Sequence, residues 1–409
     1  MRKMKDSGVE WIGEIPKDWN CMRLKFAFGN SNVGESVDKE LYSSDENGYI
    51  FYTAGANPVK TSYTEFPMWK YTTDNDILLA RNGTPYIYLP SKDAVYSDHI
   101  IRINIKDGYC RRFLRYCLQR SIESIIVDSV SIATWSISLW KEQKLPLPYY
   151  HEQKYLADYL DSKCSKIDEI VEKQKVIIEK LEEYKLSIIT EAVTSGINPD
   201  VEMKDSGSVW FGSIPINWQM KRLKYVFHIQ KDIAGEEGHT VLSITQRGII
   251  PKDFSNNEGQ FANSYANYQL VHKGDFAMNH MDLLTGWVDI SKYEGVTSPD
   301  YRVFVLNDKN GMCPKYYLYM MQMCYSARIF YGLGQGVSGM GRWRLQADKF
   351  LNFYIPIPPY DEQKKIADYI TDKVNHIEVE IDKRNKLIKK YQEYKKSLIY
   401  EVVTGKKEV

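Results

Sequence analysis

The sequence has few residues of the kinds that build metal sites or disulfides. Its seven histidines form no HxxxH pair, and its cysteines form neither a CxxC pair nor a metal spacing with histidine. We therefore expect no metal site and free thiols, as is usual in a reducing cytosol. There are six cysteines: Cys21, Cys110, Cys117, Cys164, Cys313 and Cys324.

Long apolar runs are also missing. No stretch approaches the ~18 apolar residues that cross a membrane, and the N-terminal residues MRKMKDSG contain no apolar signal core. We expect a cytoplasmic location and no membrane partner. The net charge is +1, so any surface that attracts a polyanion must be local.

Catalytic motifs are equally scarce. Residues 358–360 (Pro-Pro-Tyr) look like the tail of an amino-methyltransferase motif, but Ile357 stands where that motif needs Asp or Asn. Residues 148–150 (Pro-Tyr-Tyr) lack the acidic or amide residue too. The glycine-rich residues 332–336 are followed by no Lys-Ser/Thr, so they form no P-loop. We expect a chain without enzyme activity and without a cofactor of its own.

Two blocks of sequence occur twice. Residues 4–28 match residues 203–227, with 14 of 25 positions identical, and residues 145–195 match residues 355–405, with 22 of 51 identical. The segments between these blocks have diverged and changed length. The chain is therefore an internal duplication whose framework is kept while its two middle regions differ.

The second repeated block predicts a long helix in each half. Apolar residues recur there with the 4-3 spacing of a coiled-coil seam, with Lys163 at one polar position and Lys373 as its copy. Because a seam needs a partner, we expect the two helices to pair antiparallel about an approximate two-fold axis, with both lysines at equivalent levels. The predicted seam residues, which would also include the surface that docks partners, are Leu156, Leu160, Ile167, Ile170, Ile177, Leu181, Ile188, Ile366, Ile370, Ile377, Leu387 and Leu398.

The middle regions predict similar globular domains. Buried strands are expected at residues 76–80 and 275–279, and again at 100–105 and 301–306, each pair followed by a short amphipathic helix. The expected fold class is α+β, with two globular domains separated by a long antiparallel two-helix coiled coil. The predicted boundaries are 1–148 (domain), 149–198 (helix), 199–358 (domain) and 359–409 (helix).

A rigid spacer that holds two divergent copies suits two recognition tasks at a fixed distance. Double-helical DNA is a target for which this matters, because half-sites recur every ~34 to 36 Å turn. Arg, Asn and Gln in glycine-punctuated loops suit base edges and phosphates, and residues 335–344 hold the densest group. The candidates are Lys60, Arg81, Asn82, Ser129, Ser131, Thr134, Gln246, Arg247, Asn279, His280, Gln335, Ser338, Arg342 and Arg344. A coiled-coil interaction scaffold that does not bind DNA is the alternative.

The repeated motifs resemble those of the DNA-specificity subunits of Type I restriction-modification systems. The likeness rests on WxGxIPxxWxxxRLK at Trp11 and Trp210, on IPIPPYDEQ with its partner LPLPYYHEQ, and on the matching helix ends at Glu183 and Glu393. It covers essentially the whole chain.

The resemblance implies two target-recognition domains, each reading one half of a bipartite, asymmetric double-stranded DNA sequence. It further implies that the helices fix the spacing and dock two modification subunits, which bind S-adenosylmethionine, and that restriction subunits join later. The specificity module of an atypical modification system remains a further alternative.

Overall fold

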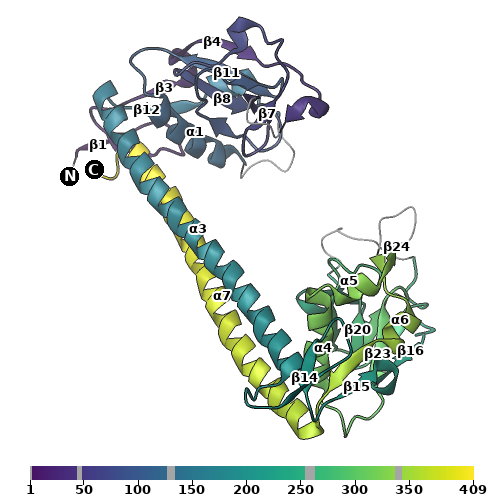
Figure 1. The fold of residues 1–409 in the computed structure, drawn as a ribbon. Coiled ribbons are helices and arrows are strands. Elements are labelled where there is room, and N and C mark those ends of the chain that lie inside the picture. Colours follow the sequence, from purple (N-terminus) through teal and green to yellow (C-terminus); the bar gives the residue numbers. More distant parts are fainter. Residues whose placement is uncertain (1, 44–47, 127–133, 254–262, 337–342) are drawn as a thin grey trace. The chain divides into compact units, whose positions relative to one another are not determined.

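The computed structural model describes residues 2–43, 48–126, 134–253, 263–336 and 343–409 (Figure 1). It divides into two compact units. Unit 1 comprises Met1–Gln174 and Asn385–Val409, and unit 2 comprises Lys175–Arg384. Each unit contains one globular domain and a stretch of each of the two long helices, α3 (Tyr150–Ser195) and α7 (Tyr360–Val403). No helix in the described part of the chain is both long and apolar enough to span a membrane.

The main sheet of unit 1 has the strand order β4-β11-β8-β9, with all neighbours antiparallel. Its strands are β4 (Phe28–Val33), β8 (Asp76–Ala80), β9 (Ile87–Tyr88) and β11 (Ile100–Ile105). Helix α1 (Arg111–Ile126) packs against this sheet. All five side chains of β8 are buried, as its apolar run predicts, and Asp76 at its start accepts hydrogen bonds from Thr73 N (2.6 Å) and Asn104 Nδ2 (2.8 Å).

Unit 2 repeats this framework. Its main sheet has the order β16-β23-β20-β21 and carries helix α4 (Pro314–Ser326) in the place of α1. The strands are β16 (Phe227–Gln230), β20 (Phe276–Met278), β21 (Val288–Ile290) and β23 (Arg302–Leu306). These elements confirm the α+β fold and the internal repeat that the sequence predicts.

Smaller elements of the framework are repeated as well. A hairpin, a strand pair and a short helix occur in both units. In unit 1 they are β1 (Met4–Asp6) with β2 (Glu14–Pro16), β3 (Asn20–Arg23) with β12 (Lys144–Leu147), and α2 (Ile137–Lys141). In unit 2 they are β13 (Met203–Asp205) with β14 (Ser213–Pro215), β15 (Gln219–Arg222) with β26 (Tyr354–Ile357), and α6 (Ala347–Asn352).

The remaining strands differ between the units. Unit 1 has a second four-stranded sheet of order β10-β6-β7-β5, formed by β5 (Tyr42–Ser43), β6 (Tyr49–Tyr52), β7 (Val59–Thr61) and β10 (Val95–Tyr96). The described residues of unit 2 instead form three two-stranded pairs and a short helix, α5 (Ile329–Leu333). The pairs are β17 (Leu242–Thr245) with β18 (Gly248–Pro251), β19 (Gln269–Val271) with β22 (Gly295–Thr297), and β24 (Gln335–Gly336) with β25 (Trp343–Arg344).

The burial of side chains along the long helices agrees with the predicted seam at alternate positions, such as Leu160, Ile167 and Ile188. At the predicted positions between them, the seam is displaced by one residue. Lys163 is exposed, Ile170 and Ile177 are only half-buried, and Leu387 is 37% exposed. The row with 4-3 spacing in which no position is exposed comprises, in α3, Gln153, Ala157, Leu160, Cys164, Ile167, Val171, Gln174, Ile178, Leu181, Lys185, Ile188 and Ala192. Those of α7 are the same positions shifted by 210, from Gln363 to Val402.

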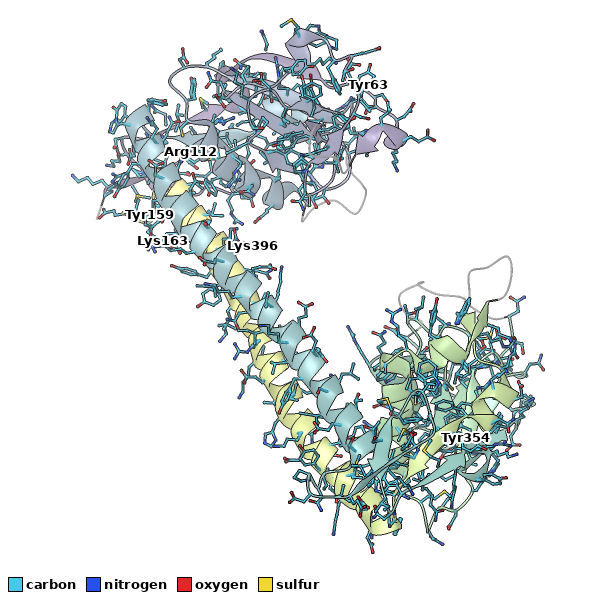
Figure 2. The ribbon with its side chains drawn as sticks, viewed as in Figure 1. Tyr63, Arg112, Tyr159, Lys163, Tyr354 and Lys396 are labelled. Atoms are coloured by element: carbon cyan, nitrogen blue, oxygen red, sulfur yellow. The ribbon has the colours of Figure 1, made fainter. Side chains whose placement is uncertain are left out.

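The predicted residues outside this seam lie beside it on the helix surface. Leu156 is buried because it packs into the globular core of unit 1, whereas Tyr184 is 57% exposed. Lys163 and Lys373 share one environment, since each ammonium lies over the ring of the tyrosine four residues earlier. The distance to the ring centroid is 5.6 Å for Lys163 over Tyr159 (Figure 2) and 5.8 Å for Lys373 over Tyr369.

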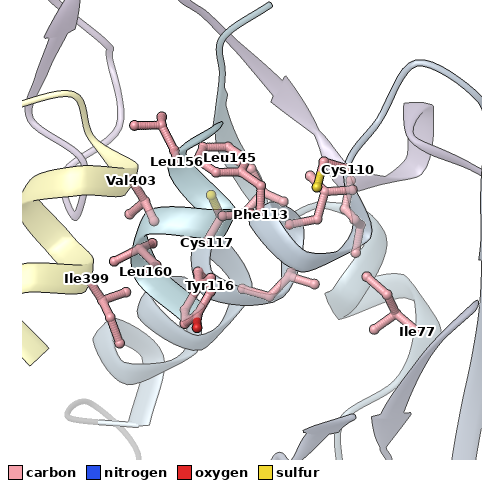
Figure 3. Packing of buried hydrophobic residues seen from close by; sticks show 14 of the residues in the cluster. Ile77, Cys110, Phe113, Tyr116, Cys117, Leu145, Leu156, Leu160, Ile399 and Val403 are labelled. Carbon is pink, nitrogen blue, oxygen red and sulfur yellow. The ribbon is translucent and has the colours of Figure 1, made fainter. Parts of the chain in front are cut away.

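Within each unit the long helices run antiparallel. In unit 1 the start of α3 packs against the end of α7, because Leu160 belongs to the same buried cluster as Ile399 and Val403 (Figure 3). Asp168 of α3 also accepts two hydrogen bonds from Lys395 Nζ, each of 2.6 Å. In unit 2 the end of α3 meets the start of α7, where Val193 and Ile370 share a cluster.

A buried glutamine joins each long helix to its globular domain. Gln153 donates from Nε2 to Pro148 O (2.9 Å) and accepts from Cys110 N (2.9 Å). Its copy Gln363 donates to Pro358 O (3.0 Å) and accepts from Cys313 N (3.0 Å). The repeated glutamine of the sequence therefore has a structural role, because it satisfies backbone groups that would otherwise be buried without partners.

Candidate nucleic-acid interface

In unit 1, two candidate residues lie at one end of the main sheet, where β8 ends and β11 begins. Arg81 follows β8 directly and donates from Nη1 to Asp98 O (3.1 Å). Asn82 is exposed, and its Nδ2 lies 3.0 Å from His99 Nδ1. We call the surface formed by Arg81, Asn82, Asp98 and His99 the first sheet end. Its amide and imidazole groups can donate and accept hydrogen bonds, as base edges require.

The segment before α2 reaches the same surface. Trp135 N donates to Arg81 O (2.6 Å), which places the exposed Thr134 beside the first sheet end. Ser129 and Ser131 lie outside the described residues. Lys60 lies on β7 of the second sheet and is half-buried. That sheet adjoins the first sheet end through the hydrogen bond from Ser97 N to Tyr52 O (2.9 Å).

The structure shows an exposed apolar pair near the first sheet end that was not among the predicted site residues. Met68 is 90% and Trp69 57% exposed, on a single 3-10 turn. The turn is held by the buried Lys70, whose ammonium donates to Gly34 O (3.0 Å) and pairs with Glu35 (2.8 Å). The two adjacent large apolar residues are visible in the sequence. Only the structure shows that they are exposed and that a buried lysine fixes their position.

In unit 2, the equivalent sheet end follows β20 and contains Asn279. This residue lines a polar cleft of ≈ 360 Å³, together with Ser243, Lys252 and Asp300. Its side-chain oxygen accepts hydrogen bonds from two backbone amides of the same loop, Met281 N (3.2 Å) and Asp282 N (3.3 Å). The Asn279 amide nitrogen is thereby oriented by its own loop.

The structure corrects the prediction for His280. Its side chain is only 5% exposed, so it does not lie on a surface that DNA can reach. Burial, together with the cations of Arg302 and Arg344, lowers the pKa of His280 to about 3. Its backbone oxygen accepts from Leu345 N (3.0 Å), the counterpart of the bond from Trp135 to Arg81 in unit 1. His280 therefore holds the segment before α6 in place.

The candidates in residues 335–344 lie partly in this segment. Gln335 on β24 is exposed, while Arg344 on β25 is half-buried, and the two residues are paired across the hairpin. Trp343, also on β25, is held against Tyr331 of α5. Its Nε1 donates to Tyr331 O (2.6 Å), and the rings of Trp343 and Tyr331 stack with centroids 5.1 Å apart. Ser338 and Arg342 lie outside the described residues.

Gln246 and Arg247 are not brought together with Asn279. Both are exposed in the turn between β17 and β18, and they line a cleft whose opposite wall is α3, with Glu182 and Lys185. Gln246 Nε2 donates to Thr285 O (3.4 Å). The sequence could not separate these two groups, since both are polar loops of the same domain.

The described residues of the chain contain no group of three or more His, Cys, Asp or Glu side chains that could hold a metal ion. The two sheet ends instead present amide, guanidinium and hydroxyl groups around a rigid sheet. Such groups bind ligands by hydrogen bonding and charge, and this suits contacts to base edges and phosphates.

The chain matches the family model described as the Type I restriction modification DNA specificity domain, over residues 16–183 and 215–390. The two matches cover well over half of the chain and fall one in each half. The chain therefore belongs to this family, whose members recognise target DNA within a restriction-modification complex and are not themselves enzymes. This confirms the resemblance stated from the sequence motifs.

Two curated relatives are similar along nearly their whole length. The Type I restriction enzyme MjaVIII specificity subunit of Methanocaldococcus jannaschii is 25% identical over 426 residues, covering 96% of this chain and 93% of that protein. The putative Type I restriction enzyme MjaX specificity subunit of the same organism is 23% identical, covering 97% and 95%. A solved structure from a study of complex assembly and conformational transition in the Type I system has the same fold, with a TM-score of 0.67, 13% identity and coverage of 96% and 99%.

Proposed function

We propose that each globular domain reads one half of a bipartite, asymmetric double-stranded DNA target. The observation that carries this proposal is the contrast between the repeated framework and the differing strands around it. The main sheet, the helix packed on it and the glutamine junction recur in both units. The strands beside this framework are arranged differently, as one four-stranded sheet in unit 1 and as two-stranded pairs in the described part of unit 2. Two readers built on one framework but with different edges suit two different half-sites.

The sheet ends are the surfaces we assign to base reading. Asn82 in unit 1 lies two residues after β8, and Asn279 in unit 2 follows β20 directly. An asparagine amide can pair with two groups of adenine. Arg81, Lys60 and Thr134 in unit 1 would act beside them on bases or phosphates. Gln335 and Arg344 would do so in unit 2.

The long helices would fix the gap between the half-sites and dock the modification subunits. We infer two such subunits, one for each copy of the Pro-x-Pro-x-x-x-Glu-Gln block, with S-adenosylmethionine bound to them and not to this chain. Exposed tyrosines that are identical in both helices, Tyr184 (57% exposed) and Tyr394 (51%), support two equivalent docking surfaces. Restriction subunits would join the assembled complex.

The decisive experiment is co-expression with a cognate modification subunit, followed by mapping of methylated bases across a host genome by long-read sequencing. A single split motif with a constant gap is the expected result. Continuous or palindromic motifs would contradict two different readers. A stable complex without new methylation would favour a coiled-coil scaffold that does not bind DNA, and a pull-down that recovers a different partner would point to an atypical modification system.

A further inference from the structure

Unit 1 contains a cleft of ≈ 920 Å³ between α1 and the paired stretches of α3 and α7. It lies away from the first sheet end, on the side of the main sheet that α1 covers. Five cations line it, two from α1 and three from α7, and Lys396 is one of them (Figure 2). They are Arg115, Arg120, Lys389, Lys395 and Lys396.

Four carboxylates also line the cleft, and three of them are already bound. Asp168 accepts from Lys395 (2.6 Å), and Glu123 pairs with Arg120. Asp161 accepts from Arg112 Nη1 (2.6 Å) and from the hydroxyl of Tyr116 (2.7 Å). These pairs neutralise one another, so the remaining side chains set the charge that a ligand would meet.

The remaining side chains are mainly basic. Among the residues that the structure describes, Arg115, Lys389 and Lys396 have no carboxylate within ion-pairing distance, against the one remaining carboxylate, Glu393. The Arg115 guanidinium lies over the Tyr116 ring at 4.6 Å, and its Nε is buried without a hydrogen-bond partner. The two lysines are exposed one above the other on the same face of α7, seven residues apart.

Unit 2 has a corresponding cleft that lacks the three unpaired cations of unit 1. It is lined by Lys185, which pairs with Glu182 (2.5 Å), and by Arg247 of the β17–β18 turn, against the further carboxylates Asp289 and Glu378. A cleft of ≈ 620 Å³ lies between α4, α3 and α7, and the hydroxyl of Tyr319 lies 3.0 Å from Thr371 Oγ1, as Tyr116 lies against Asp161 in unit 1. The repeat replaces the three unpaired cations of the unit 1 cleft and the paired Arg120, and it keeps the paired Lys395 as Lys185. Arg115 becomes Leu318, Arg120 becomes Met323, Lys389 becomes Glu179 and Lys396 becomes Leu186.

We propose that the cleft of unit 1 binds phosphate groups of the DNA backbone through Arg115, Lys389 and Lys396, contacts for which the cleft of unit 2 has no cation at the equivalent positions. This rests on the proposed function, which makes DNA the ligand. An acidic protein segment is the other polyanion to consider. A partner that docks on both halves alike would need the same residues in both clefts, so loss of the cations from one cleft favours DNA. The contact would be independent of sequence, since phosphates carry no base information.

The test uses the full chain in complex with its modification subunits. Binding to a duplex that contains the target and to a scrambled duplex is measured over a series of salt concentrations. The variant Lys389→Gln/Lys396→Gln is compared with Lys180→Gln/Lys390→Gln, which removes the same charge from exposed helix positions outside the cleft. Each lost phosphate contact lowers the slope of log K against log salt by about 0.9.

The expected result is a slope lower by about two for the cleft variant on both duplexes, with an unchanged preference for the target, and no change for the control. The reverse variant Glu179→Lys/Leu186→Lys should raise the slope. Equal slopes for wild type and cleft variant would overturn the cleft proposal while leaving sequence-specific binding intact. Loss of modification-subunit binding with an unchanged slope would assign the cleft to an acidic protein segment. Absence of DNA binding by the wild-type complex would instead overturn the proposed function.

Discussion

His280 should make the stability of unit 2 sensitive to mild acid. The pKa of this buried histidine is lowered from its ordinary value of 6.5 to about 3, by burial and by the nearby cations of Arg302 and Arg344. A histidine whose folded pKa is lowered stabilises the folded state above pH 6.5. That contribution is lost progressively as the pH falls from 6.5 toward 3, because the unfolded chain then binds a proton that the folded chain excludes.

The size of the effect follows from linkage. Each pH unit below 6.5 costs about 1.4 kcal/mol of unfolding free energy as long as folded His280 stays neutral, so the loss at pH 5 is about 2 kcal/mol relative to neutral pH. At pH 5 the folded His280 ring is still neutral, because its pKa lies well below 5. The glutamine variant His280→Gln removes the titrating group and should flatten this part of the profile.

Urea unfolding followed by tryptophan fluorescence at pH 7.5 and 5.0 would measure the change, and hydrogen exchange over residues 276–278 would assign it to unit 2. His272→Gln is the matched control, since this histidine lies in the same unit with a side chain that is 50% exposed. Wild type and His272→Gln should lose about 2 kcal/mol more than His280→Gln on acidification. An equal loss in all three proteins would refute the assignment of a buried neutral ring.

Three further predictions concern the junction, the seam and the reading surface. Gln363→Ala removes a side chain that binds a buried carbonyl and a backbone amide, so urea unfolding should report a loss of about 2 to 4 kcal/mol, similar to that of Gln153→Ala. Ile388→Asp, at a seam position, should destabilise the helix pair by at least 2 kcal/mol more than Leu387→Asp, which lies beside the seam, and thermal unfolding monitored at 222 nm would decide. Asn82→Ala should relax or abolish one half of the methylated motif and leave the other half unchanged, and a change in both halves would contradict separate readers.

The repeated framework could be predicted well from the sequence, because runs of apolar residues directly indicate which strands are buried. Residues 77–80 form a continuous apolar run after Asp76, and the structure makes residues 76–80 the fully buried strand β8. The seam was harder, because α3 has two apolar faces. One faces α7, and the other faces the globular core through Leu156. Ranking positions by apolar size therefore selects Ile170 and passes over its smaller, buried neighbour Val171.

The candidate interface was less predictable, because residue type does not reveal direction. Arg81, Asn82 and Thr134 come from separate parts of the sequence and meet at the first sheet end. His280 has the same polar character and yet points inward. Its neighbour Asn279 is half-buried at a cleft. Adjacent residues after a strand point their side chains to opposite faces of the sheet. Which of the two points inward is fixed by the pairing register of β20 with β23.

The internal duplication separates structural residues from recognition residues without any outside comparison. Residues that are identical in both halves and buried, such as Gln153 with Gln363 and Trp19 with Trp218, hold the framework. Residues that differ at equivalent exposed positions, such as Lys389 and Glu179, do not hold the framework and can bind different ligands in the two units. Exchanging residues 28–143 for residues 227–353 should therefore yield a folded chain with two equal readers, whose methylated motif is a repeat of one half-site. A swapped chain that folds and still modifies the original asymmetric motif would place recognition outside the diverged regions.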